Sequence, residues 1–451
     1  MKTKQRVFVT GATGVVGSRA VPQLVAAGYD VTAVARTPAK AEQLRAAGAT
    51  PVSVSLFDPA GLRDAIAGHW AVVNLATKIP PLSQAALPGA WKENDRIRNE
   101  ASGLLVDAAL AVGVERFVQE SITFTYPESG DAWIDAETTE IEPSAALSAV
   151  GVAEANARRF GDAVVLRFGQ FYAPEASHTV DLVAGARRGI GAVVGSPDAY
   201  QSAINGDDAA AAVVAALGAP AGTYDIVDDE PLTKAASAEA MGAAVGKAPK
   251  VKLPGRAGKL GGASMSALLR SQRISNRRFK EATGWAPRYP SVREGFAAVV
   301  AAMPKAPKAP LLDRLVRPVL AVLSLVTVQL GVWAAFFPQS FYDTFPGPRH
   351  WISPSGPYNR HFITDFGELQ LALLVVLVAA LVRPDRYLVR TAALAYMVFA
   401  VPHLTYHVIH LSDYTEAVDK AANIGTLAFS VVLPAILVLG TATQREAPSA
   451  A

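Results

Sequence analysis

Hydrophobic and polar positions in the N-terminal part of the chain follow two alternating patterns. Short apolar runs typical of buried strands are separated by longer segments whose apolar residues recur at helical spacing. The predicted strands cover residues 7–10, 30–36, 50–55, 70–75 and 116–120, and helices are predicted between them. Strands that alternate with helices in this way predict an α/β fold with a doubly wound parallel sheet.

The pattern changes after about residue 311, where the apolar segments become much longer. Four such segments follow, at residues 319–337, 362–382, 391–411 and 424–440. The first has no charged residue and is long enough to cross a bilayer as a helix. We therefore predict four transmembrane helices within residues 313–441, joined by a Pro/Lys-rich linker at 304–312 to a first domain at 1–303, with a cytoplasmic tail at 442–451.

Basic residues around the apolar segments predict their orientation. Cytoplasmic loops of membrane proteins are enriched in Lys and Arg. One set of flanks contains Lys305, Lys308, Arg314, Arg317, Arg383, Arg386 and Arg390, and the other contains Arg349, Arg360 and Lys420. Because residues 1–5 also lack the apolar stretch of a secretory signal, we expect an inner (plasma) membrane protein whose N-terminal domain is cytoplasmic.

Composition excludes several classes of function. The net charge of +3 gives no basic surface of the kind that nucleic acids require, so we expect no nucleic-acid partner. The chain has no cysteine, which excludes disulfides, thiolate metal sites and thiol catalysis. The expected partners are a small-molecule substrate and the lipid bilayer.

A glycine-rich turn lies directly after the first predicted strand. Gly11, Gly14 and Gly17 are spaced three apart, and an apolar helical pattern follows them. Gly11 allows a tight turn, Gly14 lets the backbone approach phosphates, and Gly17 lets the helix pack on the strand. The residues of this turn predicted to contact a dinucleotide are Gly11, Thr13, Gly14, Val15, Val16 and Gly17.

Residues after the next strands refine the choice of cofactor. An acid after the second strand favours NAD, but this position holds Ala35 and Arg36. The arginine suits the 2′-phosphate of NADP, so we predict NADP in preference to NAD. Asp58 is expected to bond the adenine, to cap the following helix, or both. Backbone at Ala76 and Thr77 should lie close to the cofactor.

Several motifs together resemble the extended short-chain dehydrogenase/reductases of the NAD-dependent epimerase/dehydratase family. They are the stretches at residues 10–17, 74–77, 116–121, 165–174, 205–210, 222–231 and 284–295. The resemblance covers about residues 5–302 and implies a Rossmann domain with a small substrate subdomain.

The family's catalytic residues are only partly present. The resemblance implies a Ser/Thr after the fifth strand, which is Ser121, and a Tyr-x-x-x-Lys pair on the next helix, which supplies acid–base chemistry. Glu154 aligns with a glutamate that commonly follows this pair, so Leu147 and Gly151 occupy the Tyr and Lys positions. Neither residue can transfer a proton, and no tyrosine in the chain has lysine four residues later.

Other side chains are candidates for the role of this pair. Tyr126 is the candidate proton donor, and Thr123 and Lys78 are expected near it. The alternative is that Tyr126 only packs on a loop. Tyr172 and His178 follow the sixth strand and are predicted to contact substrate. A basic run either holds a phosphorylated substrate or forms a solvated helix face; it comprises Arg270, Arg273, Arg277, Arg278 and Lys280.

The apolar segments contain unusual polar residues. Asp365 and Glu368 share one helix face, and His403, His407 and His410 share another. Ionisable groups at membrane depth are costly and are often functional. No metal site is predicted, although His403 and His407 are weak candidates to bind a metal or haem. The alternatives are that these polar residues bind a quinone headgroup or form hydrogen bonds between helices. The four segments loosely resemble small bacterial DoxX-like membrane proteins.

These observations support one main hypothesis and two alternatives. The main one is a membrane-anchored, NADP-binding oxidoreductase of atypical type that acts on a lipophilic or quinone-like carbonyl. The first alternative is a non-catalytic NADP(H)-binding sensor. The second is a nucleotide-sugar epimerase or dehydratase, which the missing Tyr/Lys pair disfavours because that chemistry needs a strong base.

Overall fold

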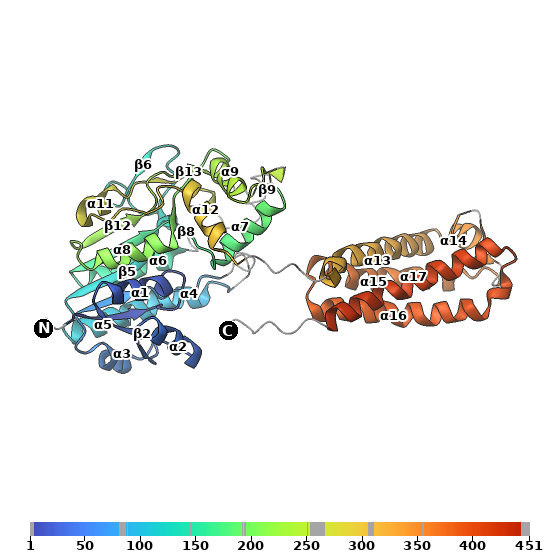
Figure 1. Cartoon of the computed structure of the whole chain (residues 1–451), viewed down its shortest axis with the longest axis horizontal. Helices are drawn as coiled ribbons and strands as arrows, with labels where there is room; N and C mark the ends of the chain where they lie inside the picture. Colours follow the sequence, from blue (N-terminus) through green and yellow to red (C-terminus); the bar gives the residue numbers. More distant parts are fainter. Residues whose placement is uncertain are drawn as a thin grey trace. The chain divides into compact units, whose positions relative to one another are not determined.

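The chain forms two compact units, Met1–Pro304 and Lys305–Ala451 (Figure 1). The computed structural model describes residues 4–80, 87, 89–144, 147–191, 193, 195–249, 251–252, 267–304, 311–347, 349–353 and 356–442. Most of the predicted linker and nearly all of the predicted tail therefore lie outside the described residues.

A seven-stranded parallel sheet is the framework of the first unit. Its strand order is β12-β7-β5-β4-β1-β2-β3, which is that of a doubly wound sheet, so the predicted fold class is confirmed. The strands are β1 (Arg6–Thr10), β2 (Asp30–Val34), β3 (Thr50–Val52), β4 (Ala71–Asn74), β5 (Arg116–Ile122), β7 (Ala163–Phe168) and β12 (Gly222–Ile226). All of their carboxyl ends meet at one edge of the sheet.

Alternate strand residues point to opposite faces, and each face has its own apolar core. Val7, Val9 and Val73 pack in the core that also holds residues of α1 (Gly17–Ala26) and α8 (Gly206–Ala216). On the other face, Phe8 and Phe117 pack in the core that contains residues of three helices. These helices are α3 (Pro59–Ile66), α5 (Ser102–Ala111) and α6 (Ser148–Arg158). α2 (Pro38–Ala46) adds Leu44 to the first core.

The helical segment between β4 and β5 is interrupted. α4 (Lys92–Arg96) and α5 are separated by a π-helical turn at Ile97–Ala101. This turn contains Arg98, which is buried and paired with Glu120 at the end of β5. A π-helical turn is one of the few ways to redirect a side chain within a continuous helix.

Smaller elements form the subdomain beyond β7. Within the described residues, short strands pair as β8 (Gln170–Tyr172) with β11 (Ala203–Asn205), β9 (Ile190–Gly191) with β14 (Val251–Lys252), β10 (Tyr200–Gln201) with β13 (Leu232–Thr233), and β6 (Trp133–Ile134) with β15 (Arg273–Ile274). Its helices are α7 (Ser177–Arg187), α9 (Lys234–Ala244), α11 (Arg277–Thr283) and α12 (Val292–Ala302).

The second unit contains four helices that are long and apolar enough to cross a membrane. They are α13 (Leu311–Phe336), α15 (Arg360–Val382), α16 (Arg386–Ile409) and α17 (Ala417–Ala442), and the short α14 (Pro338–Thr344) lies between the first two. Asn359 and Asp385 cap α15 and α16, so both helices start before the apolar segments that predicted them. α13 and α15 approach closely at Gly367, where a Cβ would lie 2.3 Å from the backbone nitrogen of Ala335.

Candidate cofactor and active site

The glycine turn between β1 and α1 is shaped by close backbone contacts. Gly11 has φ of +66°, and a Cβ there would lie 2.2 Å from the carbonyl oxygen of Leu75. A Cβ on Gly17 would lie 2.2 Å from the oxygen of Gly11, so both positions require glycine. Gly14 is exposed, and its Cβ would meet only the oxygen of Gly11, at 3.3 Å. The turn is therefore closed on its inner side and open at Gly14.

The N-terminus of α1 fits a phosphate group. In the described residues, no side chain caps this helix and its first turn has no acidic residue. Its first backbone N–H groups, from about Val16 and Gly17, therefore carry the positive end of the helix dipole. A glycine cradle and an uncapped helix start are the features that hold a dinucleotide pyrophosphate.

The other predicted cofactor contacts lie at the same edge of the sheet. Arg36 is exposed, two residues beyond β2. Asp58 caps α3: its Oδ1 accepts hydrogen bonds from the backbone nitrogens of Ala60 (3.2 Å) and Gly61 (3.1 Å). Ala76 and Thr77 directly follow β4 and lie beside the glycine turn, because Leu75 is the residue that Gly11 contacts. Thr13, Val15 and Val16 belong to the turn itself.

Polar side chains join the carboxyl ends of β1, β4 and β5. Thr10 Oγ1 donates to Asn74 Oδ1 at 2.6 Å, and Asn74 Nδ2 donates to Gln119 Oε1 at 2.9 Å. Asn74 Oδ1 also accepts from the backbone nitrogen of Ala76 at 3.3 Å. This buried row fixes the start of the loop that carries Ala76 and Thr77. It was not predicted, although each member is a polar residue near the end of an apolar strand.

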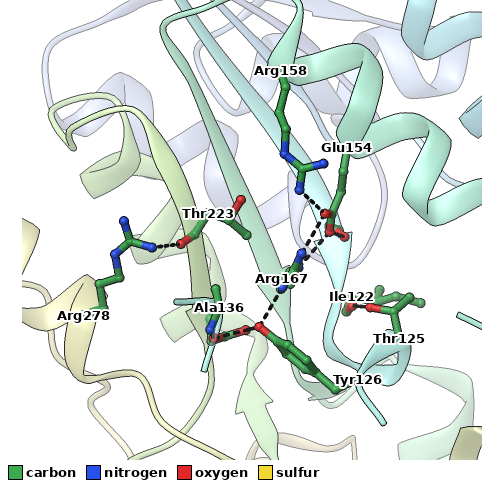
Figure 2. A network of polar contacts seen from close by, with 11 residues as sticks. Ile122, Thr125, Tyr126, Ala136, Glu154, Arg158, Arg167, Thr223 and Arg278 are labelled. Atoms are coloured by element: carbon green, nitrogen blue, oxygen red, sulfur yellow. Dashed lines mark hydrogen bonds and ion pairs between the residues drawn. The ribbon is translucent and has the colours of Figure 1, made fainter. Parts of the chain in front are cut away.

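A second polar network crosses β5, β7 and β12, where Ser121, Arg167 and Asp225 are neighbours in register (Figure 2). The Arg167 guanidinium bonds both oxygens of Glu154 on α6 at 2.8 Å. It also donates to the Tyr126 hydroxyl at 2.8 Å. That hydroxyl in turn donates to Asp225 Oδ1 at 2.9 Å.

This network changes the roles predicted for Ser121 and Tyr126. Ser121 is fully buried, and its hydroxyl donates to Glu154 Oε1 at 2.6 Å. Tyr126 is also fully buried, and burial, together with the charge of Asp225, raises the pKa of its hydroxyl. The buried Tyr126 hydroxyl is held between Arg167 and Asp225. The geometry therefore favours a structural role for Tyr126 over the predicted catalytic one.

The two buried carboxyl groups of this network, Glu154 and Asp225, are stabilised to different extents in their charged forms. Burial opposes ionisation of Glu154, but hydrogen bonds from Arg167 and Ser121 and the charges of Arg167 and Arg158 outweigh it and lower the pKa of the carboxyl. Burial of Asp225 instead raises the pKa of that carboxyl to about 7, against hydrogen bonds from Tyr126 and the backbone of Ala136. Charged residues inside apolar strands were the available signal for Arg167 and Asp225.

Asp225→Asn is expected to change how stability depends on pH. The folded carboxyl keeps its proton up to about pH 7, whereas the unfolded one loses it near pH 3.8. Between these values the folded state binds more protons, so the unfolding free energy of the wild type falls as pH rises, and the variant lacks this component. Thermal melting from pH 5 to 8 measures it, with Asp162→Asn, an exposed acid, as the control. Parallel curves for wild type and Asp225→Asn would contradict it.

The positions of the missing proton-transfer pair are apolar in the structure. Leu147 is buried with Val150 and Ala267, and Ile122 and Phe124 pack against them. Gly151 lies one turn further along α6, where a Cβ would contact only Ile141, at 3.8 Å.

The predicted substrate contacts are mostly engaged in packing. The Tyr172 hydroxyl is buried and donates to Asp228 Oδ2 at 3.1 Å, and Thr123 is buried in the 3-10 turn after β5. His178 Nε2 contacts the carbonyl oxygen of Phe171 at the start of α7. Tyr172 and Thr123 thus lack the exposure that a substrate contact requires. Lys78 is exposed beyond β4.

The basic run serves mainly to hold the subdomain together. Arg270 Nη1 donates to the carbonyl oxygens of Tyr126 (2.7 Å) and Glu142 (2.8 Å). Arg278 donates to the oxygen of Thr223 (3.1 Å), as Figure 2 shows. Lys280 pairs with Asp229 at 2.8 Å. These contacts favour a structural role for the basic residues over a phosphate-binding role.

The membrane histidines lie close together without forming a metal cluster. The rings of His403 and His407 are 4.8 Å apart between centroids and nearly perpendicular, at 79°. In the residues that the structure describes, no three His, Asp or Glu side chains are placed to share a metal ion. The carboxylate of Asp365 pairs with His361 at 3.2 Å instead.

Comparison with known proteins gives an NAD(P)H-binding family and similar folds. A family described as NAD(P)H-binding matches residues 11–158, which include the glycine turn and α6. The fold is similar to a human epimerase family protein solved with NADPH (TM-score 0.57, 24% identity, covering 66% of this chain and 100% of that one). It is also similar to the Thermus thermophilus UDP-glucose 4-epimerase complex with NAD (TM-score 0.55, 21% identity, covering 67% and 100%).

Sequence comparison gives relatives that act as reductases or dehydrogenases. A 90-residue segment, 20% of this chain and 27% of the relative, is 37% identical to a sterol-4-alpha-carboxylate 3-dehydrogenase (decarboxylating) from Dictyostelium discoideum. A 3-diazoavenalumate denitrifying reductase from a Streptomyces species is 32% identical over 305 residues, which cover 64% of this chain and 98% of the relative. The chain therefore belongs to the NAD(P)H-binding family that includes this Streptomyces protein.

Proposed function

We propose that this protein is a membrane-anchored, NADPH-dependent reductase that acts on a lipophilic, quinone-like carbonyl. One observation carries the proposal: the glycine cradle is complete, whereas Leu147 and Gly151 replace the proton-transfer pair within an apolar cluster. The chain thus keeps the turn that binds the cofactor but lacks the pair that transfers a proton to the substrate.

The missing acid restricts the substrate. A bound reduced nicotinamide supplies a hydride. Reduction of an aliphatic ketone leaves a strongly basic alkoxide, which needs a nearby side-chain acid. Reduction of a quinone leaves a phenolate-like oxygen, whose pKa is near that of tyrosine, about 10, so water suffices as the proton source.

The membrane part of the proposal rests on the second unit. Its four long apolar helices support anchoring, and a lipophilic substrate would explain why a reductase is attached to them. Arg383 lies between α15 and α16, and Arg386 and Arg390 lie in the first turns of α16. These basic residues favour a cytoplasmic position for that end of the helices and for the first unit, in a plasma membrane.

Arg36→Asp is expected to reverse the nucleotide preference. The guanidinium is exposed beyond β2, where the 2′-phosphate of NADP would lie, and an aspartate there would repel that phosphate and bond the ribose hydroxyls of NAD. We expect NADPH affinity to fall about 10- to 100-fold, the effect of losing one charge-assisted pair. Fluorescence titration with NADPH and NADH measures this, and Arg63→Asp on α3 is the control. An unchanged ratio would remove the basis for NADP.

The proposed reaction is tested with the full chain in detergent. NADPH is incubated with a decyl-substituted benzoquinone and with an aliphatic ketone of similar length, and consumption is expected only with the quinone. Leu147→Tyr with Gly151→Lys restores the missing pair and should add ketone reduction, because Gly151 has space for a side chain. Ketone reduction by the wild type would contradict the proposal.

A non-catalytic NADP(H) sensor is the second candidate. It is favoured by the engagement of Ser121 with Glu154, which removes the last hydroxyl of the family's catalytic set. Tight NADPH binding without turnover of any carbonyl would support the sensor. Epimerisation of a nucleotide sugar is less favoured, because the relative covered almost end to end is named as a reductase.

A further inference from the structure

Polar and aromatic side chains converge where α16 ends and α17 begins. The Tyr414 hydroxyl contacts His407 Nδ1 at 3.1 Å and accepts a hydrogen bond from Asn423 Nδ2 at 3.0 Å. The ring of His403 meets that of His407, with centroids 4.8 Å apart. We call His403, His407, Tyr414 and Asn423 the interior polar cluster.

This cluster is covered by the segment between α14 and α15. The Trp351 ring packs edge-on against Tyr414, with centroids 6.2 Å apart. Trp351 Nε1 donates to Asp419 Oδ1 at 3.1 Å, and Asp419 also pairs with Arg349. Trp351, Tyr414 and Asn423 are all buried. Within the cluster, Tyr414 and Asn423 are thus covered, while His403 and His407 are half-buried.

The cluster has hydrogen-bonding capacity that the described residues do not use. Asn423 is 4% exposed, and its Oδ1 is buried with no partner among them. His403 has ring contacts with Phe399 and His407, but within the described chain neither of its ring nitrogens has a hydrogen bond. A buried polar atom without a partner, such as Asn423 Oδ1, is destabilising, and a bilayer offers no water to relieve it. Such groups indicate a ligand that bonds to them.

Aromatic rings continue from the cluster into the bundle. Phe399 stacks on His403 (5.1 Å, 23°) and lies 6.0 Å from Phe366 of α15. Phe366 in turn stacks with Phe341 of α14 at 5.9 Å. A ligand beside the polar cluster would thus contact flat apolar rings, which favour another flat ring.

We propose that the interior polar cluster binds the headgroup of a membrane quinone or quinol. An imidazole nitrogen can donate to a quinone carbonyl or accept from a quinol hydroxyl, and the Asn423 amide oxygen can accept from a quinol. The aromatic rings fit the flat headgroup, and the lipid provides for its apolar tail. A metal fits less well, because only His403 and His407 offer imidazoles here and the described residues hold no third acid or histidine in place.

The interior polar cluster lies far from the start of α16. His403 follows the start of α16 by 17 residues, which is about 25 Å of helix. α13 and α16 run in the same direction, so the cluster lies at the end of the bundle away from the linker. Quinone binding at the interior polar cluster does not depend on whether the first unit reduces a substrate.

Quinone binding is tested by fluorescence of the full chain in detergent, without NADPH. Decylubiquinone is expected to quench tryptophan fluorescence saturably, and Trp351→Phe should remove most of that quenching. His403→Phe and Asn423→Leu keep volume but remove the polar atoms, so each should weaken apparent binding at least about 10-fold. His410→Phe is the matched control, because its ring stacks on Tyr406 outside the cluster. Decanol, a tail without a ring, should not compete.

Several results would overturn the inference. They are unsaturable quenching by decylubiquinone, equal binding by wild type and by both His403→Phe and Asn423→Leu, and competition by decanol. A stoichiometric metal that copurifies with the wild type and is lost in His403→Phe would reassign the cluster to a metal. Thermal melting and size-exclusion profiles identify any variant that has lost its fold, in which case the second variant decides.

Discussion

Gly11→Ala is expected to lower NADPH affinity about 100-fold, which corresponds to about 3 kcal/mol. An alanine at φ of +66° costs about 1–2 kcal/mol by itself. Its Cβ would also lie 2.2 Å from Leu75 O and 2.6 Å from Ala76 N, so the end of β4 must move. That movement displaces Ala76 and Thr77, which line the predicted cofactor site. Titration of the full chain with NADPH measures the loss.

Gly113→Ala separates the two causes. Gly113 has φ of +73°, close to that of Gly11, but a Cβ there would have no atom within 4 Å. This control should lose stability through backbone strain and keep its NADPH affinity. Equal NADPH affinity in Gly11→Ala and wild type would show that the turn does not hold the cofactor.

Arg167→Met is expected to lower the unfolding free energy by about 3–5 kcal/mol, the typical cost of breaking a buried ion pair. The guanidinium bonds Glu154 and Tyr126 inside the sheet, and its loss leaves the Glu154 carboxylate buried with fewer partners. Urea unfolding of the full chain in detergent, followed by circular dichroism, measures the change.

Two further variants test whether the network causes this loss. Arg159→Met breaks an exposed pair with Asp107 and should cost less than about 1 kcal/mol. Adding Glu154→Gln to Arg167→Met should recover part of the stability, because the uncompensated charge is removed. Strictly additive losses in the double variant would argue against a coupled network.

The sequence was sufficient where structure depends on neighbouring residues. Short apolar runs specify strands such as 7–10, and the spaced glycines after it specify a tight turn that requires glycine at positions 11 and 17. Asp58 before Pro59 is a local helix-start signal, and it caps α3. Charge-free segments specify long apolar helices in the same way, because length and composition suffice.

The tertiary structure alone decided which polar residues are available for chemistry. Tyr126 follows the strand that should present catalytic groups, yet its partner Asp225 lies 99 residues away and encloses it. Tyr172 is turned inward by Asp228, 56 residues on. Burial and hydrogen bonding depend on contacts between distant segments, which no local pattern contains. The sequence by itself thus determined the two-part architecture, the dinucleotide turn and the lack of a Tyr-x-x-x-Lys pair, and the fold determined that Ser121 and Tyr126 are buried.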